Sequence, residues 1–412
     1  MTLEVDSACI TQELETLASF SDASAPAVTR VVFTDADLRA RTWLKQLCTE
    51  AGLEVREDAV GNMFARWTGA DASAPGVGTG SHIDAIPNAG RYDGTVGVLG
   101  GLEAIRALKR SGFNPARSIE LLLFTSEEPT RFGIGCLGSR LLSGSLSPEA
   151  ASQLTDTSGE SLDLVRRKAG FDAPLSSVAL QPGHYAAFVE LHIEQGPRLE
   201  QAGLQLGIVT SIAAPATLRI VLQGEGGHAG AVLMHERRDA LTAAADIIVA
   251  VEASALRTNT PDTVATTGIC EVFPGAVNSI PSRVTLGIDL RDIDLDRRDA
   301  VLTEIQMHAE SIARTRHVSL EASVLNADAP GQTDPKIVET LTSVCGELDL
   351  HFTKLVSRAY HDSLFMSRVV PTAMLFIPCR DGISHRPDEH AAPLDIANGV
   401  RALAHALHRL AS

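Results

Sequence analysis

The residues best suited to chemistry are three histidines and three carboxylates that stand where apolar segments or predicted helices begin and end. In an open α/β sheet, ligands bind at such strand ends. Imidazole and carboxylate groups together suit a pair of divalent cations about 3.5–4 Å apart, as in hydrolases that act through two metal ions. The candidate metal ligands are His82, Asp93, Glu128, His192 and His385, with Glu127 as the candidate general base.

Each of these residues can also be explained by an ordinary structural role that involves no metal. His82 follows a strand-like segment, and Asp84, two residues on, could accept the second N–H of its imidazole, but a His-x-Asp triplet alone is weak evidence. Asp93 precedes a predicted helix and could simply cap it. His192 could be a core histidine and His385 a loop residue. Only the whole constellation favours a metal site.

Two adjacent carboxylates, Glu127 and Glu128, follow the apolar segment 119–125. Neighbouring carboxylates repel each other unless a cation or a shared proton compensates. One can bind metal while the other takes a proton from the nucleophilic water, although a solvated loop pair explains them equally well. A metal pair needs a bridging carboxylate, and Asp93, at a helix amino terminus, is the best placed candidate.

The elements that must position these residues follow an α/β order. The continuously apolar segment 119–125, interrupted only by Glu120, is typical of a central strand covered on both faces. Alternation from Phe188 to Glu194 puts Glu190, His192 and Glu194 on one strand face. The other predicted elements are helices at 35–51, 94–110 and 161–169, one ending at 346 and one starting at 394, and strands at 53–58, 61–67, 77–80, 351–357 and 372–377.

The middle of the chain changes to the order strand, helix, strand, strand, helix, strand, which is the split βαβ order of a ferredoxin-like domain. These elements are predicted at 217–222, 236–255, 263–272, 283–291, 294–315 and 317–324. The predicted fold is therefore an α/β catalytic domain with a central mixed sheet flanked by helices. It comprises residues 1–212 and 330–412 and is interrupted by an inserted ferredoxin-like α+β domain, residues 213–329.

Composition excludes several classes of protein. A chain of 412 residues exceeds the size at which one core usually stops growing, which favours two domains. A formal net charge of −16 disfavours binding to nucleic acid or to an anionic membrane. The six cysteines form no Cys-x-x-Cys pair, and we see neither a signal peptide nor an apolar segment of ~18 residues. We therefore expect a reduced, cytoplasmic protein.

Taken together, the motifs resemble those of the dinuclear metallo-amidohydrolases, the hydantoinase/carbamoylase-type amidases. This family includes N-carbamoyl-L-amino acid hydrolases, allantoate amidohydrolase, β-ureidopropionase and ureidoglycolate amidohydrolase. The resemblance covers nearly the whole chain. Its motifs are Gly80-Ser81-His82-Ile83-Asp84, Gly90-Arg91-Tyr92-Asp93-Gly94, Ser126-Glu127-Glu128, Glu190-Leu191-His192-Ile193-Glu194-Gln195-Gly196-Pro197, Gly227-His228-Ala229-Gly230 and Gly382-Ile383-Ser384-His385.

The resemblance implies a role for each candidate at the metal site. It also implies that the inserted domain mediates a homodimer and that Mn²⁺ is favoured over Zn²⁺ as the metal. The implied roles are His82 and His192 as ligands of one metal, Glu128 and His385 as ligands of the other, Asp93 as the bridge and Glu127 as the general base.

The same resemblance implies which residues contact the substrate. His228 would reach the active site of the partner subunit and stabilise the oxyanion, which gives it a catalytic role as well. Gln195, Asn278 and Arg291 match positions that hold the substrate, with the arginine pairing its carboxylate. Two of them have simpler readings, since Arg291 could form a surface ion pair and Asn278 could be a turn residue.

One segment departs from the commoner family pattern. Most carbamoyl hydrolases have Gly-Ala-Gly-His-Asp-Ala where this chain reads Arg358-Ala359-Tyr360-His361-Asp362-Ser363. That variant resembles the ureidoglycolate branch of the family. Tyr360 would shrink the pocket and add a hydroxyl donor, and with His361 it would favour a small, hydroxylated substrate.

The sequence therefore predicts a metal-dependent amidohydrolase that cleaves the ureido C–N bond of a small ureido acid. The favoured substrate is (S)-ureidoglycolate, converted to glyoxylate, ammonia and carbon dioxide. The alternative is an N-carbamoyl-L-amino acid or allantoate hydrolase with the same machinery. A non-catalytic binding protein on the same fold is a remote second class, because such a descendant need not retain Glu127 and all five ligands.

Overall fold

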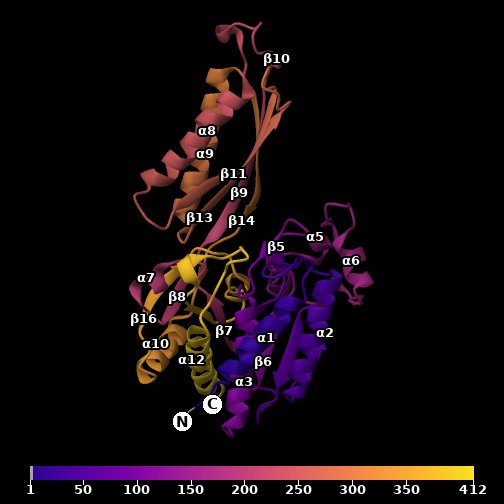
Figure 1. Ribbon diagram of the computed structural model, residues 1–412, viewed down its shortest axis with the longest axis vertical. Helices are drawn as coiled ribbons and strands as arrows, with labels where there is room; N and C mark the ends of the chain where they lie inside the picture. Colours follow the sequence, from indigo (N-terminus) through magenta and orange to yellow (C-terminus); the bar gives the residue numbers. More distant parts are fainter. Residues whose placement is uncertain (1–2) are drawn as a thin grey trace. The chain divides into compact units, whose positions relative to one another are not determined.

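The computed structural model describes residues 3–412. The chain divides into two compact units. The first unit runs to Thr210 and resumes over Gln332–Ser357 and His361–Ser412, and the second comprises Ser211–Gly331 with Arg358–Tyr360. Figure 1 shows the second unit interrupting the first along the chain.

The first unit is built on a mixed sheet of nine strands. Its centre is parallel, because β17 pairs β7, β7 pairs β4 and β4 pairs β6 in the same direction. Antiparallel strands flank this centre, as β3 does beside β6 and β8 beside β17. In order across the sheet the strands are β15 (Gly331–Gln332), β8 (Leu206–Ile212), β17 (Thr372–Ile377), β7 (Tyr185–Ile193), β4 (Gly76–His82), β6 (Ile119–Phe124), β3 (Met63–Trp67) and β2 (Glu54–Glu57), with β16 (Phe352–Ser357) beside β8.

Both faces of this sheet are buried, as the apolar pattern of β6 predicts. Ile119, Leu121 and Leu123 pack into one hydrophobic cluster, whereas Leu122 and Phe124 pack into another. The first cluster includes residues of the long helices of this unit, which are α1 (Ser7–Ser19), α2 (Asp35–Glu50), α3 (Thr95–Arg110), α10 (Pro335–Glu347) and α12 (Pro393–Ala411). These helices extend from α10 on the left of Figure 1 to α2 on the right.

The second face is covered by short elements in the part of the chain where sequence signals are weak. The expected helix there is present as α6 (Leu162–Lys168), started by the Ser161 hydroxyl. Four further short helices were not predicted, nor were α1, β8 and the ribbon of β1 (Val28–Arg30) with β5 (Ala85–Ala89). The four helices are α4 (Leu137–Leu142), α5 (Pro148–Ser152), α7 (Arg198–Ala202) and α11 (Asp362–Met366).

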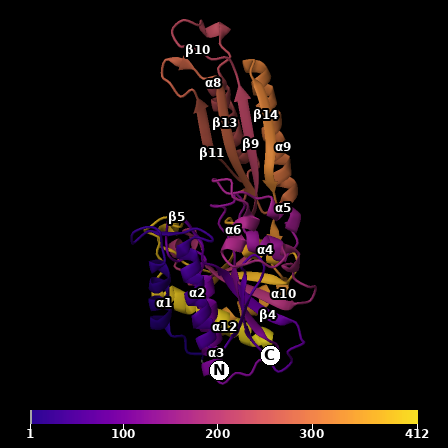
Figure 2. The same ribbon diagram turned by 90° about the vertical axis from the view of Figure 1, so that its right-hand side faces the viewer.

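The second unit has the predicted split βαβ order. Its four strands are antiparallel and lie in the order β11, β13, β9, β14, with α8 and α9 on one face (Figure 2). The alternating Val284, Leu286, Ile288 and Leu290 point into that helix-covered core. The bounds are β9 (Ala214–Gln223), α8 (Ala240–Arg257), β11 (Val264–Phe273), β13 (Arg283–Asp292), α9 (Leu295–Arg316) and β14 (Ser319–Ala327).

The helix expected from residue 236 begins later than predicted. Asp239 caps α8, because its carboxylate accepts the backbone N–H groups of Leu241 and Thr242. Residues Met234–Glu236 form a separate 3₁₀ turn instead. A short ribbon of β10 (Gly227–His228) and β12 (Ser279–Ile280) completes the unit.

Candidate metal centre

Two histidines leave the carboxyl ends of the parallel strands with their Nε2 atoms facing the same carboxylate. The Nδ1 of His192 lies 2.9 Å from the carbonyl oxygen of Ile193, and the Nδ1 of His82 lies 3.1 Å from that of Asp84. Each Nδ1 therefore donates its proton to a backbone carbonyl, which leaves the lone pair of Nε2 as the candidate metal donor. The Nε2 of His192 also accepts the backbone N–H of Gly94 at 3.1 Å. These Nε2 atoms lie 3.2 Å (His192) and 3.6 Å (His82) from Oδ1 of Asp93.

The second oxygen of Asp93 faces a different pair of residues. Its Oδ2 lies 3.2 Å from Nε2 of His385, and that same nitrogen lies 3.2 Å from Oε1 of Glu128. Asp93 thus presents one oxygen to each of two donor sets, as a bridging carboxylate must. Among the five candidates only His385 has an exposed side chain, at 45%, so this side of the cluster is open to solvent.

A glycine makes this approach possible. Gly94, the residue before α3, has φ +67°, and a Cβ there would lie 2.4 Å from Nε2 of His82. Any other residue would be strained and would collide with the ring. The motif that contains Asp93 therefore needs Gly94 for two reasons: its backbone conformation and the space that the ring of His82 occupies.

The donor chemistry fits divalent metal ions. Two sets of three residues, each with donor atoms within 4.8 Å of one another, share Asp93: His82, Asp93 and His192, and Asp93, Glu128 and His385. Burial would raise the pKa of Asp93, but the nearby imidazoles of His192, His385 and His82 outweigh it and hold that pKa well below its usual range. Its hydrogen bonds with Asp93 and Glu128 raise the pKa of His385 to about 11. The cluster thus attracts positive charge, which divalent metal ions supply.

A third set, Glu190, His192 and His361, is also close enough to hold an ion. Its carboxylate is already engaged, since Glu190 accepts the hydroxyls of Ser81 at 2.6 Å and Ser363 at 2.5 Å. His361, predicted to contact the substrate, is buried with its ring centroid 4.6 Å from that of His192. Glu190 therefore connects the segments of Ser81 and Ser363 through hydrogen bonds.

Glu127, the predicted base, is buried beside the first donor set. Its Oε2 lies 3.8 Å from Nε2 of His82, and its Oε1 accepts the thiol of Cys136 at 3.5 Å. Burial raises the pKa of Glu127 well above its usual range; His82 opposes this shift and Glu128 adds to it. A carboxylate with a raised proton affinity, next to a cluster of ligands, is suited to accept a proton from water.

Asp84 supports the cluster in a different way from the one expected. Its carboxylate is 3.7 Å from Nδ1 of His82, too far for a hydrogen bond, and its carbonyl oxygen holds that ring instead. The carboxylate accepts the backbone N–H groups of Glu127 at 3.2 Å and Glu128 at 3.0 Å. Asp84 therefore accepts the imidazole N–H as expected, but through its backbone carbonyl oxygen and not through its carboxylate.

Gln195 and Glu389 both contact Asp93. Gln195, predicted to hold substrate, donates from Nε2 to Oδ2 of Asp93 at 2.6 Å, and its Oε1 is buried without a partner in the described structure. Glu389 was not among the predicted residues, and neither was Cys136. The signal for Glu389 was an acidic residue four positions after His385 within one loop; Cys136 had no signal beyond its residue type.

Four further predicted residues lie on the second unit. His228 is exposed on β10, and the carbonyl of Asn278 accepts the backbone N–H of Ala229 at 2.9 Å. Arg291 pairs with Asp289, Nε to Oδ1 at 2.7 Å, and also donates to the carbonyl of Arg358 at 3.1 Å. Arg291 thus forms an ion pair in the structure, as the simpler interpretation of this residue predicts.

The Tyr360 hydroxyl is also engaged within the second unit. It donates to Oδ2 of Asp328 at 2.7 Å. A substrate hydroxyl that bonds Tyr360 would have to share or replace this contact.

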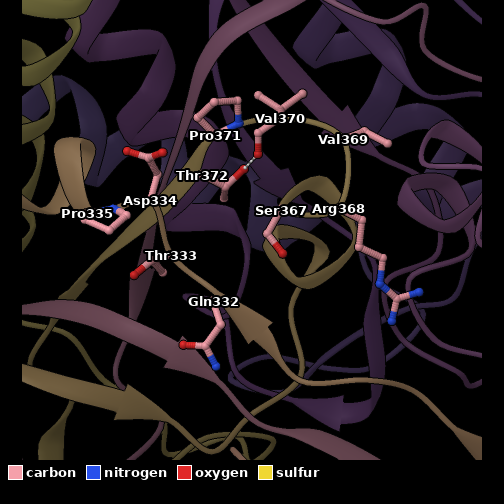
Figure 3. A pocket seen from close by; sticks show the side chains of 10 residues that line it. All are labelled: Gln332, Thr333, Asp334, Pro335, Ser367, Arg368, Val369, Val370, Pro371 and Thr372. Carbon is pink, nitrogen blue, oxygen red and sulfur yellow. Dashed lines mark hydrogen bonds between the residues drawn. The ribbon is translucent and has the colours of Figure 1, made fainter.

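A hollow of about 420 Å³ lies where α10 and β17 begin (Figure 3). The Thr372 hydroxyl on its wall donates to the carbonyl of Val370 at 2.9 Å. None of the predicted site residues lines this hollow, which segments 332–335 and 367–372 form. Across residues 3–412, the helices are all too short or too polar to traverse a bilayer.

Comparisons with known proteins place these features in a family. The model of "Peptidase family M20/M25/M40" matches residues 78–409. Ureidoglycolate hydrolase of Arabidopsis thaliana is 52% identical over 415 residues, covering 99% of this chain and 87% of the relative. N-carbamoyl-L-amino acid amidohydrolase of Geobacillus stearothermophilus is 40% identical, covering 93% of each chain. Crystal structures of AtUAH in complex with glyoxylate and with (S)-hydroxyglycine each match with a TM-score of 0.92 at 52% identity, covering 99% of this chain and 98% of the other.

Proposed function

The chain belongs to peptidase family M20/M25/M40 and is an amidohydrolase, and from this premise we propose that it hydrolyses the ureido C–N bond of (S)-ureidoglycolate. The observation that carries the reaction class is the two-sided placement of Asp93 between two sets of imidazole and carboxylate donors. The substrate rests on the relatives that bear the name ureidoglycolate hydrolase and on the segment Arg358–Ser363.

We assign the two donor sets to two divalent metal ions, with Mn²⁺ favoured and Zn²⁺ as the alternative. Oxygen-rich ligation with imidazole admits both. When bound, such a pair supplies an activated water molecule and polarises the substrate carbonyl. The residues that would hold it are His82 and His192 on one side, Glu128 and His385 on the other, and Asp93 between them.

The chain's own residues then move the proton and hold the substrate. Glu127 accepts a proton from the attacking water, since its carboxylate is buried and its proton affinity is raised. His228 of the partner subunit is assigned to the oxyanion that develops on the ureido carbonyl. The C–N bond breaks, and the nitrogen leaves with a proton as 2-hydroxyglycine.

The products follow from this cleavage. The carbamate that is released decays to ammonia and carbon dioxide. The 2-hydroxyglycine loses a second ammonia and leaves glyoxylate. Both the hydroxy acid and the oxo acid are the ligands named in the AtUAH complexes.

We assign substrate recognition to Gln195, Asn278, Arg291, Tyr360 and His361, with His228. A net charge of −16 disfavours an anionic substrate at long range, so its carboxylate needs a guanidinium at close quarters. In this account Arg291 exchanges part of its pairing with Asp289 for the substrate carboxylate. Tyr360 likewise offers its hydroxyl, now on Asp328, to the substrate's 2-hydroxyl group.

A second candidate function is the hydrolysis of N-carbamoyl-L-amino acids or of allantoate. The relatives named for these activities favour it, since they share the family and much of the chain. Their machinery would be the same. The discriminating position is Tyr360, because a small residue there would leave room for a larger substrate.

The stoichiometry of the products tests the proposal. Purified protein supplied with Mn²⁺ and (S)-ureidoglycolate should release two ammonia molecules for each glyoxylate, and no urea. Glyoxylate and ammonia are measured by coupled assays and urea by a urease control. Release of urea in place of ammonia would contradict hydrolysis at the ureido carbonyl, because it would mean that the other C–N bond breaks.

A further inference from the structure

Glu389 is buried between the two loops that carry metal ligands on either side of the bridge. Its side chain belongs to the loop that follows His385, and only 4% of the residue is exposed. Its Oε1 accepts two successive backbone N–H groups, from Tyr92 at 2.7 Å and from Asp93 at 3.1 Å. This one oxygen therefore fixes the backbone from which the bridging carboxylate projects.

The other oxygen of Glu389 reaches the second loop. Its Oε2 lies 3.0 Å from the hydroxyl oxygen of Ser384, the residue before His385, and shares the single proton of that hydroxyl with Asp93. The same hydroxyl oxygen lies 2.6 Å from Oδ2 of Asp93. Glu389, Ser384 and Asp93 thus form one connected set, in which a shift of either loop breaks at least one contact.

Gly90, which has no side chain, leaves room for the carboxylate of Glu389. A Cβ on Gly90 would lie 2.3 Å from the Cβ of Glu389 and 2.4 Å from its Oε1. Burying a carboxyl group beside another carboxylate costs free energy. Fold stability alone does not call for such an arrangement, whereas a metal centre that needs its ligands held does.

Glu389 is poorly placed to be a ligand itself. Among the described residues it belongs to none of the sets of donor atoms that could hold an ion. Its contacts go to the residues beside the donors. A role in holding ligands is therefore the one that its geometry supports.

We propose that Glu389 is a positioning residue of the metal centre, whose hydrogen bonds hold Asp93 and His385 at the spacing that two cations require. It acts through the shape of its hydrogen bonds and not through its charge. The inference rests on the proposed metal site and is independent of which ureido acid is the substrate.

The test is a titration of metal-free full-length protein with Mn²⁺, in which the electron paramagnetic resonance signal of the free ion reports binding. Glu389→Ala should weaken Mn²⁺ binding by ~10–100-fold, the usual effect of removing a group that orients a ligand. Glu389→Gln should stay within ~3-fold of wild type, because its amide oxygen still accepts both N–H groups and its NH₂ can donate to Ser384. Asp388→Asn removes the adjacent exposed carboxylate, which pairs with Arg386, and should change nothing.

Thermal unfolding of the metal-free variants separates positioning from folding. If Glu389→Ala does not fold, Ser384→Ala carries the test, since it removes one hydroxyl from the same set and should also weaken Mn²⁺ binding. Wild-type affinity in the folded Glu389→Ala or Ser384→Ala variant would overturn the inference, as would equal losses in the Ala and Gln variants at position 389. Failure of the wild-type protein to bind Mn²⁺ would instead overturn the proposed metal site.

Discussion

At the scale of single residues, the chemistry of the candidate site depends on where each imidazole places its proton. Backbone carbonyls of Ile193 and Asp84 accept from Nδ1 of His192 and His82, which directs both Nε2 atoms toward Asp93. A carboxylate in the place of either carbonyl would also have fixed the ring. The backbone solution leaves the Asp84 carboxylate free to hold the amides of Glu127 and Glu128.

The separation of base from ligand predicts distinct effects for two adjacent residues. Glu127→Gln should retain its metal and lose about three orders of magnitude or more in kcat, because an amide cannot accept the proton of water. Glu128→Gln should instead lose metal affinity. Steady-state kinetics and metal analysis of both variants measure this. Loss of metal in Glu127→Gln with normal turnover per bound ion would mean that the two roles are reversed.

Hydrolysis should depend on bound metal. Dialysis against a chelator should abolish hydrolysis, and added Mn²⁺ should restore it. The reason is that the proposed mechanism has no other means of activating the attacking water. The assay is ammonia release before and after reconstitution, with the metal content measured in parallel. Activity that persists in a demonstrably metal-free sample would contradict the mechanism.

The sequence indicates the five candidate ligands that the structure places in two donor sets, because each stands in a motif at a strand or helix end. It did not find Glu389, because the contact of this residue with Asp93 joins segments far apart in the chain. It did not find Cys136 either, because the loop between Glu127 and Cys136 has no periodic pattern that would place the thiol. It also could not foresee that Tyr360 is engaged by Asp328, because local sequence does not encode which distant carboxylate a hydroxyl meets.

At the scale of elements, the start of α3 connects backbone conformation to metal binding. Gly94→Ala should destabilise the protein by about 1–2 kcal/mol, because φ +67° is costly for a residue with a Cβ. It should also weaken Mn²⁺ binding, because the added carbon meets the ring of His82. Urea unfolding and Mn²⁺ titration measure the two effects.

The matched control for this variant is Gly346→Ala. Gly346 lies in α10 with no atom within 4 Å of an added Cβ, so alanine should be neutral or stabilising there. Equal Mn²⁺ affinity in Gly94→Ala and wild type would show that the close approach of Gly94 to His82 has no role in ligation.

The sequence predicts best those helices and strands that have a strong periodic pattern. The strand β17 has the predicted bounds, and β13 alternates as expected because one face is covered by helices. The short helices α4 and α5 were missed, since helices of 6 and 5 residues have little periodicity and depend on packing. The start of α8 was misplaced because Asp239 competes with Glu236 as the first residue, and only the former accepts the free amides.

At the scale of the whole molecule, the division of the candidate residues between two units is the main consequence of the fold. The metal donors and Glu127 belong to the first unit, whereas His228, Asn278 and Arg291 belong to the second. If the protein is a homodimer in which His228 serves the partner's site, then two different inactive variants can complement each other.

Mixing His228→Ala with Glu127→Gln tests this arrangement. In a mixed dimer one site has both Glu127 and His228 intact, so random reassortment of equal amounts should recover about a quarter of wild-type activity. Size-exclusion chromatography with differently tagged subunits measures the exchange. No recovery after confirmed exchange would place His228 in its own subunit's site or outside catalysis.

A panel of kcat/KM values tests the assignment of (S)-ureidoglycolate as the substrate. The panel contains (S)-ureidoglycolate, N-carbamoyl-glycine, larger N-carbamoyl-L-amino acids and allantoate, with wild-type protein and Tyr360→Gly. A site that bonds a substrate hydroxyl can reject analogues without it, so kcat/KM for (S)-ureidoglycolate should exceed the others by at least ~10²-fold, and Tyr360→Gly should erode that margin. Equal or greater kcat/KM on a carbamoyl amino acid or on allantoate would contradict the assignment and leave only the reaction class standing.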